Sequence, residues 1–353
     1  MDRILRVLIV DDSAYVRKVI KQMLSRSPFI EVVGAACDGE EALEMLRDLR
    51  PDVVTVDLIM PGIGGLGFIR EQMARAPVPI VVVSIASETS QMVLDALDAG
   101  AIDFVQKPSA LATEKVLEMS DELVEKVKTA GSVRLSVIKP PRDIVQPEVG
   151  AGPAAKSAIE VVAIGISTGG PQALKYLIPR FPADFSVPVV IVMHMPAGYT
   201  EMYAKRLNEM SALNVREAQE GDPITKGSVL IAPAGRHFTF RRMSSGVVAH
   251  LDARPFDTLH RPSVDVLFRS AAETYGKGVL GVVMTGMGED GRQGAEKIKS
   301  SGGILFAEAE ESCIVYGMPR AIVDAGLASR IIPLGKIVEG ILETAYGKNP
   351  DRR

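Results

Sequence analysis

The chain has 353 residues, of which 47% are hydrophobic and 24% are charged, so it is long enough for two ordinary globular domains. Its net charge of −4 argues against broad binding to nucleic acid or to an anionic membrane surface. Its apolar runs are the length of strands, well below the ~20 residues of a membrane span, and charges interrupt the N-terminal run, so we expect a cytoplasmic protein without direct membrane insertion.

The first third of the chain alternates short, β-branched apolar runs with segments whose apolar residues recur at helical spacing. This alternation predicts a doubly wound α/β domain, in which a parallel sheet carries helices on both faces. We expect strands at residues 7–10, 31–35, 53–56, 80–83 and 102–105. We expect helices at residues 14–24, 40–49, 66–75, 89–99 and 113–129.

Polar side chains follow these strands at the carboxyl edge of the sheet, where parallel sheets bind ligands. In chain order they are Asp11 and Asp12, then Asp57, Ser84 and Lys107. Three carboxylates at one edge repel one another unless a cation joins them, and oxygen ligands suit Mg²⁺. The lysine and the hydroxyl can then hold the oxygens of a phosphoryl group. The pattern predicts an aspartate that accepts a phosphoryl group.

Each of these residues alone has an ordinary structural explanation, since Asp12 or Ser13 can cap a helix and Lys107-Pro108 can form a turn. Together, the segments resemble the receiver domain of two-component response regulators over residues 1–128. The segments are Val7-Leu-Ile-Val-Asp-Asp-Ser13, Pro51-Asp-Val-Val-Thr-Val-Asp-Leu-Ile-Met-Pro61 and Asp103-Phe-Val-Gln-Lys-Pro108.

The resemblance implies a flavodoxin-like fold and phosphorylation of Asp57 by a histidine kinase, with Mg²⁺ as cofactor. It also implies that Ser84 is the switch hydroxyl and that Asp11 and Asp12 join Asp57 around the metal. One departure is that Gly62-Ile-Gly-Gly65 stands where such domains commonly carry Asp-Gly.

Residues 129–157 differ from what precedes them. Prolines, glycines, alanines and scattered charges replace the periodic patterns, which predicts a flexible linker partly extended by its prolines. We therefore expect a first domain at residues 1–128 and a second at residues 158–348.

The second domain again alternates apolar runs and helical patterns, which predicts a Rossmann-like sheet with a β-hairpin insertion. We expect strands at residues 161–165, 187–193, 229–232, 237–242, 247–250, 278–285 and 304–307, with a hairpin turn at residues 244–246. We expect helices at residues 171–177, 198–210, 263–275, 291–300 and 337–346.

The segment Gly165-Ile-Ser-Thr-Gly169 fits the pattern G-x-S-x-G at a strand-to-helix turn. Such a turn either cradles a phosphate or exposes a nucleophilic serine. His194 follows 27 residues later, the length of one β-turn-helix-β unit, so a right-handed crossover places both residues at one sheet edge. Asp290 follows a third strand through a glycine-rich loop. The three can form a Ser-His-Asp triad, with a backbone N–H near Met287 as oxyanion donor.

Ordinary alternatives exist for these residues too. His194 alone fits a satisfied core histidine, and Asp290 can cap the helix that follows it. His237 and His250, in the hairpin region, are expected to be peripheral. His260 precedes a helix that Ser263 is expected to cap, with Asp265 near its N-terminus. The chain order Ser-His-Asp also differs from the order in α/β-hydrolases.

Several separated motifs in residues 160–343 resemble the protein-glutamate methylesterase domain of bacterial chemotaxis. They are Gly165-Ile-Ser-Thr-Gly-Gly170, His194-Met-Pro196, residues 260–268, Met284-Thr-Gly-Met-Gly-Glu-Asp-Gly291 and Tyr316-Gly-Met-Pro-Arg320. The resemblance implies Ser167 as nucleophile, His194 as base, Asp290 as its orienting partner and the Met287 N–H as oxyanion donor. No cofactor is implied for the ester chemistry.

A receiver followed by this domain implies a phosphorylation-activated esterase. Its substrates would be glutamate γ-methyl esters on the helical cytoplasmic domain of chemoreceptors, with methanol released, and it would also deamidate receptor glutamines. We expect the unphosphorylated receiver to block the esterase and phosphorylation to shift the population towards an open state.

The sequence also leaves three other functions to compare with this one. A non-enzymatic regulator would use the glycine loop to bind a nucleotide or a partner. A DNA-binding response regulator needs a basic recognition helix, which the second half of the sequence does not suggest. An esterase acting in a different, chemotaxis-like pathway stays open from the sequence.

Overall fold

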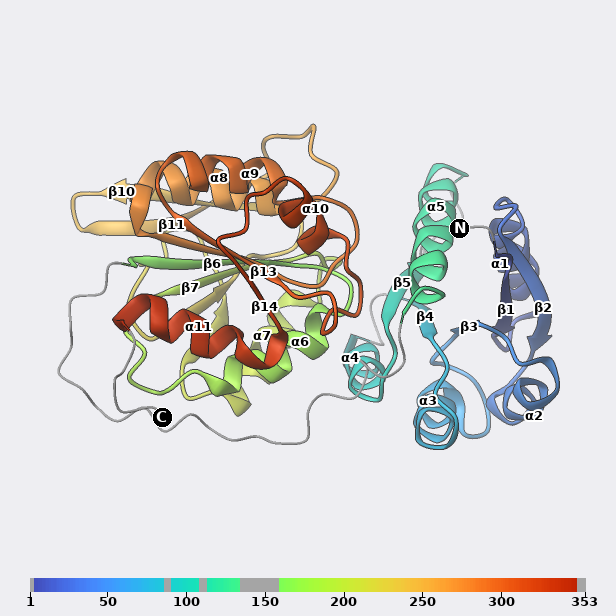
Figure 1. The fold of residues 1–353 in the computed structure, drawn as a ribbon. Coiled ribbons are helices and arrows are strands. Elements are labelled where there is room, and N and C mark those ends of the chain that lie inside the picture. The colour runs from blue at the N-terminus through green and yellow to red at the C-terminus, as the bar shows by residue number, and fades with distance from the viewer. Residues whose placement is uncertain (1–2, 86–89, 108–112, 134–158, 348–353) are drawn as a thin grey trace. The chain divides into compact units, whose positions relative to one another are not determined.

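A computed structural model describes residues 3–85, 90–107, 113–133 and 159–347 of the chain. Its contacts divide the chain into two compact units, Met1–Lys139 and Pro140–Arg353 (Figure 1). Most of the predicted linker and Pro108 lie outside the described residues. Among the helices in the described ranges, none combines the length and apolar character of a membrane span.

The first unit is the doubly wound α/β fold that the sequence predicts. Its strands are β1 (Leu5–Val10), β2 (Ile30–Ala36), β3 (Val53–Val56), β4 (Ile80–Ile85) and β5 (Asp103–Lys107). They pair in parallel in the order β2-β1-β3-β4-β5, which is the flavodoxin-like order. The helices are α1 (Ala14–Leu24), α2 (Gly39–Leu49), α3 (Gly64–Arg75), α4 (Ser90–Asp98) and α5 (Thr113–Ala130). Helix α1 packs with α5 on one face, and α3 packs with α2 and α4 on the other.

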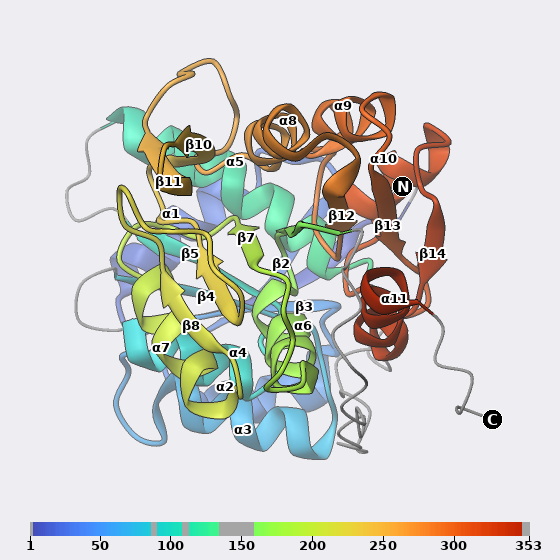
Figure 2. The same ribbon diagram turned by 90° about the vertical axis from the view of Figure 1, so that its left-hand side faces the viewer.

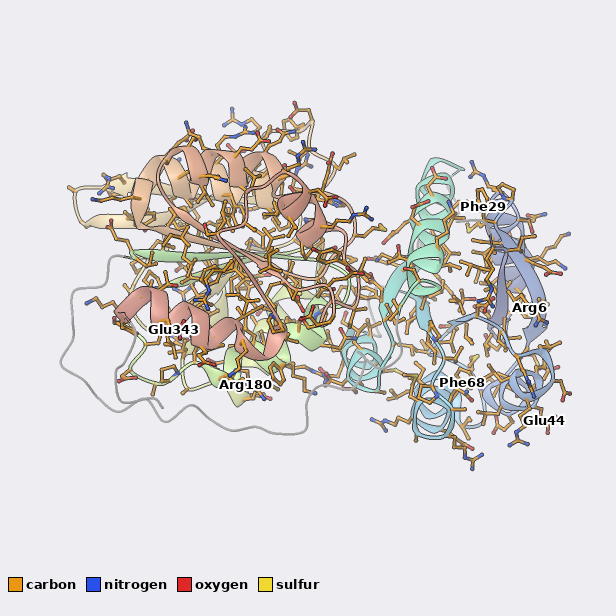
Figure 3. All side chains as sticks on the ribbon, in the orientation of Figure 1. Arg6, Phe29, Glu44, Phe68, Arg180 and Glu343 are labelled. Atoms are coloured by element: carbon orange, nitrogen blue, oxygen red, sulfur yellow. The ribbon has the colours of Figure 1, made fainter. Side chains whose placement is uncertain are left out.

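Local chemistry explains where two of these helices begin. Helix α1 starts after Ser13, whose hydroxyl accepts the Val16 N–H at 3.4 Å, so Ser13 rather than Asp12 caps this helix. Helix α3 starts at the glycine-rich departure from the receiver pattern. A Cβ on Gly65 would lie 2.0 Å from the carbonyl oxygen of Asp57, so only glycine allows α3 to pack so closely against the end of β3. The same helix buries Phe68 completely (Figure 3).

The second unit contains a seven-stranded, fully parallel sheet and a separate hairpin. The sheet strands are β6 (Val161–Ile166), β7 (Val189–Met193), β8 (Asn214–Glu217), β9 (Ser228–Ile231), β12 (Val279–Val283), β13 (Ile304–Glu308) and β14 (Arg330–Ile332). Their order is β14-β13-β12-β6-β7-β9-β8. The hairpin joins β10 (His237–Met243) to β11 (Gly246–Asp252), and its predicted turn is confirmed.

Helices cover both faces of this sheet (Figures 1 and 2). Helices α8 (Val264–Tyr275), α9 (Arg292–Ser300) and α10 (Met318–Asp324) lie on one side, together with the hairpin. Helices α6 (Gly170–Leu177), α7 (Thr200–Met210) and α11 (Leu334–Tyr346) lie on the other. Because both faces are covered, β6, β7, β9 and β12 are buried along their whole length, which explains their continuous apolar sequence.

The sequence did not predict β8, β14 or α10. Strands β8 and β14 are the two edges of the sheet, and each buries a single side chain fully, Val215 and Ile332. A short edge strand that is largely solvated carries little periodic apolar signal. Glu343 of α11, labelled in Figure 3, pairs with Arg330 at 3.1 Å and ties β14 to the rest of the unit.

Candidate active site

The strand order of the second sheet reverses between β6 and β12. From β6 the chain proceeds to β7 on one side, while the later strands β12, β13 and β14 build the other side. Ligands of open α/β sheets bind at such a switch point, beyond the carboxyl ends of the strands. The residues that follow β6, β7 and β12 therefore define the candidate active site of this unit.

Ser167 is the first residue after β6 and is partly exposed. Its N–H donates to the Thr285 carbonyl at 3.0 Å, and its own carbonyl accepts the Gly170 N–H at 2.7 Å. Gly169 has φ +80°, which lets the chain turn sharply into α6. These bonds fix Ser167 between the turn and the loop that follows β12.

His194 is the first residue after β7, the neighbouring parallel strand. Ile166 and Met193 are paired in register, and the His194 N–H donates to the Ile166 carbonyl at 3.2 Å. Ser167 and His194 therefore leave adjacent strands at the same level. The His194 side chain is only 9% exposed, and its Nε2 lies 2.8 Å from Asp290 Oδ2. Its Nδ1 is buried and has no hydrogen-bond partner among the described residues.

Asp290 takes part in four hydrogen bonds, one with His194 and three with the start of α8. Besides His194, its carboxylate accepts the Ser263 hydroxyl at 2.8 Å and the backbone N–H groups of Val264 and Asp265 at 2.8 and 3.0 Å. Burial alone would raise the pKa of Asp290, but the bond to His194 and the N–H groups of α8 outweigh it and lower the pKa. Asp290 is therefore held as a carboxylate against the His194 ring.

The expected Ser263 cap is wrong, and the alternative in which Asp290 caps α9 is not observed. Ser263 stands at the N-cap position of α8, but its side chain makes no capping bond because its hydroxyl donates to Asp290. Asp290 does not cap α9, the helix that follows it; Gly291 takes that position. Asp290 instead accepts the first N–H groups of α8, where a negative charge is favourable.

His237 was expected to be peripheral and is instead fully buried. Its Nδ1 accepts the Ser263 N–H at 3.2 Å, and its Nε2 lies 3.0 Å from the Pro255 carbonyl. Burial is the main reason that the pKa of His237 is lowered, so the ring is neutral and can accept at Nδ1. His237 thus holds both ends of the segment between β11 and α8.

That segment brings His260 to the candidate site. The His260 ring stacks on the His194 ring, with centroids 4.0 Å apart and planes inclined by 20°. A cleft of about 710 Å³ opens beside it and reaches Asp290, with Leu259, Arg269 and Arg292 among its lining residues. Leu259 is 97% exposed at this cleft. By contrast, His250 lies at the hairpin and contacts Glu220 at 2.9 Å, as expected of a peripheral histidine.

The loop after β12 packs directly on Ser167. A Cβ on Gly286 would lie 2.8 Å from Ser167 Cβ and 3.1 Å from its backbone nitrogen. The Gly286 carbonyl also accepts the N–H groups of Gly317 and Met318, so the loop cannot move away freely. Met287 is the next residue and is partly exposed beside this contact.

We expect Gly286→Ala to lower kcat by about 100-fold. The added methyl group would push Ser167, the predicted nucleophile, out of position, and a displacement of about 1 Å is enough to cost that much activity. The measurement is the rate of ester hydrolysis by purified variants. Gly335→Ala is the matched control, since a Cβ there would meet only the Tyr176 hydroxyl at 3.4 Å. Equal activity of both variants would mean that the contact at Gly286 does not matter.

The first unit has its own cluster at the switch point between β1 and β3. Carboxylate oxygens of Asp11, Asp12 and Asp57 lie within 4.8 Å of one another. Lys107 Nζ lies 2.6 Å from Asp11 and 2.5 Å from Asp57. Ser84, near the end of β4, is buried.

The charges of this cluster are not fully balanced. Burial is the main cause that raises the pKa of Asp11, and the nearby Asp57 charge raises it further, while Lys107 lowers it. One lysine faces two buried carboxylates, and Asp12 is exposed at the same edge. The all-oxygen donor set and the surplus negative charge fit a hard divalent cation such as Mg²⁺.

Each of the two units matches a known protein family. Residues 162–341 match the family described as CheB methylesterase, and residues 7–118 match the response regulator receiver domain. A protein of Myxococcus xanthus, named protein-glutamate methylesterase/protein-glutamine glutaminase 5, is 48% identical over 96% of each chain. A protein of Desulfitobacterium hafniense, named protein-glutamate methylesterase/protein-glutamine glutaminase, is 41% identical, again over 96% of each chain.

Among solved structures, the catalytic domain of a Thermotoga maritima CheB methylesterase is similar to this chain with a TM-score of 0.51 and 40% identity. The similar region spans 98% of the Thermotoga maritima domain and 52% of this chain. The similarity therefore concerns the unit that contains Ser167, His194 and Asp290.

Proposed function

The chain belongs to the CheB methylesterase family and carries a response regulator receiver domain, and we propose that it is an esterase of chemoreceptors. Its proposed substrates are the γ-methyl esters of receptor glutamates. One observation carries the proposal. His194 and Asp290 lie in hydrogen-bond contact at 2.8 Å, and they follow β7 and β12, the two strands that flank β6 and the Ser167 turn. Serine, imidazole and carboxylate in this arrangement are the components of nucleophilic acyl transfer.

In the proposed mechanism Ser167 Oγ attacks the ester carbonyl while His194 takes its proton. Nε2 of His194 is occupied by Asp290, so Nδ1, which is buried and has no partner among the described residues, is the nitrogen that accepts it. Asp290 holds the ring in this orientation and stabilises the imidazolium that forms. The backbone N–H of Met287 is the proposed donor to the oxyanion, on the loop that packs against Ser167.

Collapse of the tetrahedral intermediate breaks the bond to the methoxy oxygen, which takes the proton from His194 and leaves as methanol. Water then attacks the acyl-enzyme with His194 as base, and the receptor carboxylate and free Ser167 are regenerated. A glutamine side chain passes through the same steps with ammonia as the leaving group. We therefore propose deamidation as a second activity, in line with the names of the relatives.

We propose that the receiver, residues 1–128, regulates this activity through residues 129–157, and that residues 158–348 form the catalytic domain. A histidine kinase is the proposed phosphodonor and Asp57 the acceptor. Asp11, Asp12 and Asp57 would hold Mg²⁺, which supplies positive charge for the incoming phosphoryl group. Lys107 and Ser84 would then bond the phosphoryl oxygens. Kinase and receptor domain both act in the cytoplasm, which is the proposed location of this enzyme.

The proposal predicts that a small phosphodonor raises methanol release from methylated receptor membranes by the wild-type protein. Asp57→Asn should abolish this increase and leave the basal rate, because the amide cannot accept the phosphoryl group. Asp48→Asn, at an exposed aspartate of α2, is the matched control and should respond like wild type. A full response by the Asp57 variant would rule out Asp57 as the acceptor.

A further inference from the structure

Glu308 is a carboxyl group that the proposed mechanism does not use, although it lies inside the catalytic unit. It is the last residue of β13 and is 0% exposed. One carboxyl oxygen accepts the Thr285 N–H at 2.9 Å, and the other accepts the Ser312 hydroxyl at 2.9 Å. Ser312 in turn accepts the Leu334 N–H at 2.9 Å, so the carboxyl is anchored at both oxygens.

Thr285 joins Glu308 to the Ser167 turn. Its carbonyl accepts the Ser167 N–H at 3.0 Å, and its hydroxyl donates to the Thr168 carbonyl at 3.0 Å. The same hydroxyl accepts the Val315 N–H at 3.0 Å. Thr285 therefore links the ends of three strands, and its remaining polar group, the N–H, is the one that Glu308 accepts.

A buried carboxyl at this position carries a cost that an apolar residue would avoid. Burial is the main cause that raises the pKa of Glu308 from the ordinary 4.5 to about 7. The groups that oppose this shift are the Thr285 N–H, the Ser312 hydroxyl and the Cys313 thiol, none of them a cation. What the Glu308 side chain contributes at this position is therefore two hydrogen-bond acceptors, one for the Thr285 N–H and one for the Ser312 hydroxyl.

We infer that Glu308 and Thr285 form a positioning pair that holds the Ser167 turn in register with the loop bearing Met287. The inference rests on the proposed function, because it assigns the pair a role in placing the nucleophile relative to the oxyanion donor. Neither side chain needs to touch the substrate. Loss of the pair therefore lowers kcat and leaves KM unchanged.

The test compares kcat and KM for methanol release by full-length variants. Glu308→Leu keeps the bulk but leaves the buried Thr285 N–H unpaired, and should lower kcat by about tenfold or more. Glu308→Gln is the conservative variant, since its amide oxygen accepts the Thr285 N–H and its NH₂ donates to Ser312. It should keep kcat within about threefold of wild type, a rescue that charge loss alone would not permit.

Thr285 supplies a second, independent pair of variants. Thr285→Val preserves the shape but removes the hydroxyl bonded to Thr168 and Val315, and should lower kcat by about tenfold. Thr285→Ser keeps the hydroxyl and should stay near wild type. Leu305→Ala, at a fully buried position on β13, the strand that ends in Glu308, controls for general destabilisation and should leave kcat per folded molecule unchanged.

Unfolding measurements report whether Glu308 titrates as its burial requires. Its pKa is higher in the folded than in the unfolded chain, so its contribution to stability is present below pH 4.5 and is lost as pH rises towards 7. Glu308→Gln does not titrate. Its unfolding midpoint should therefore rise relative to wild type across this range, and the difference should level off above pH 7.

The outcomes separate this inference from the proposed function. If Glu308→Leu and Thr285→Val keep the wild-type kcat while Ser167→Ala is inactive, the positioning pair is wrong and the triad stands. If Ser167→Ala retains activity, the proposed function itself fails. A fall in kcat that Glu308→Gln does not rescue would also overturn the inference, because it would assign the effect to charge rather than to hydrogen bonding.

Discussion

Replacing Ser167 with alanine is expected to lower methanol release by about 10⁴-fold or more, the scale on which other serine hydrolases lose activity with their nucleophile. The physical reason is that no acyl-enzyme can form without Oγ. His194 and Asp290 then have only a water molecule to activate, and water is not held at the position that the strand-to-helix turn gives to the serine. Binding of the receptor segment should be unaffected, because the change removes one oxygen atom.

The measurement is single-turnover methanol release from methylated receptor membranes at saturating enzyme. Ser245→Ala, in the exposed hairpin turn of the same unit, is the control and should match wild type. A fluorophosphonate probe, which reacts with activated serines, should label the wild type at Ser167 and not the variant. Substantial methanol release by Ser167→Ala would mean that another residue is the nucleophile. The glycine-rich turn would then serve to bind a nucleotide or a partner.

The sequence predicted the central strands of both sheets because parallel strands that are buried on both faces have continuous apolar sequences. The runs that became β6, β7 and β12 are unmistakable for this reason, and their ends carry Ser167, His194 and the loop before Asp290. Strand β8 was missed because it buries only Val215 fully, so no pattern distinguishes it from a loop. Periodicity reports burial, and edge strands have little of it.

Hydrogen-bond partners distant in the sequence were the part that local patterns could not predict. Ser263 has the sequence context of a helix cap, but Asp290, 27 residues later, accepts the first N–H groups of α8 and the Ser263 hydroxyl. His237 was expected to be peripheral because it begins a hairpin strand. Its side chain is buried because it bonds the Ser263 N–H and faces the Pro255 carbonyl, and no sequence spacing encodes those contacts.

A signal for Glu308 was nevertheless present. It is a charged residue that directly ends an apolar strand, the same placement that marked Asp11 and Asp57 in the first domain. What the sequence could not show is the direction of its side chain, which is set by the Thr285 N–H on the neighbouring strand end. A carboxylate at a strand end can bind a metal ion, accept a phosphoryl group or accept hydrogen bonds that hold neighbouring loops. Only the atoms that contact it distinguish these roles.

Asp290→Asn is expected to lower the hydrolysis rate by about 10⁴-fold with the fold preserved, comparable to the loss when a triad aspartate becomes asparagine elsewhere. The amide can place its oxygen towards Ser263 and Asp265, and its NH₂ then faces His194 Nε2, while the Val264 N–H loses its acceptor. Nε2 must become an acceptor, so the imidazole proton moves to Nδ1. A protonated Nδ1 cannot take the proton from Ser167.

Asp265→Asn is the matched control, because it removes a charge from the same helix start without touching His194. Asp265 accepts the Gly294 N–H at 2.7 Å, and burial raises its pKa to about 6, so its loss should affect stability more than catalysis. Rates and thermal unfolding of both variants separate the two effects. If Asp290→Asn retained more than about a hundredth of the wild-type rate, the orientation of His194 would have to depend on something other than this carboxylate, and its stacked neighbour His260 would be the next residue to test.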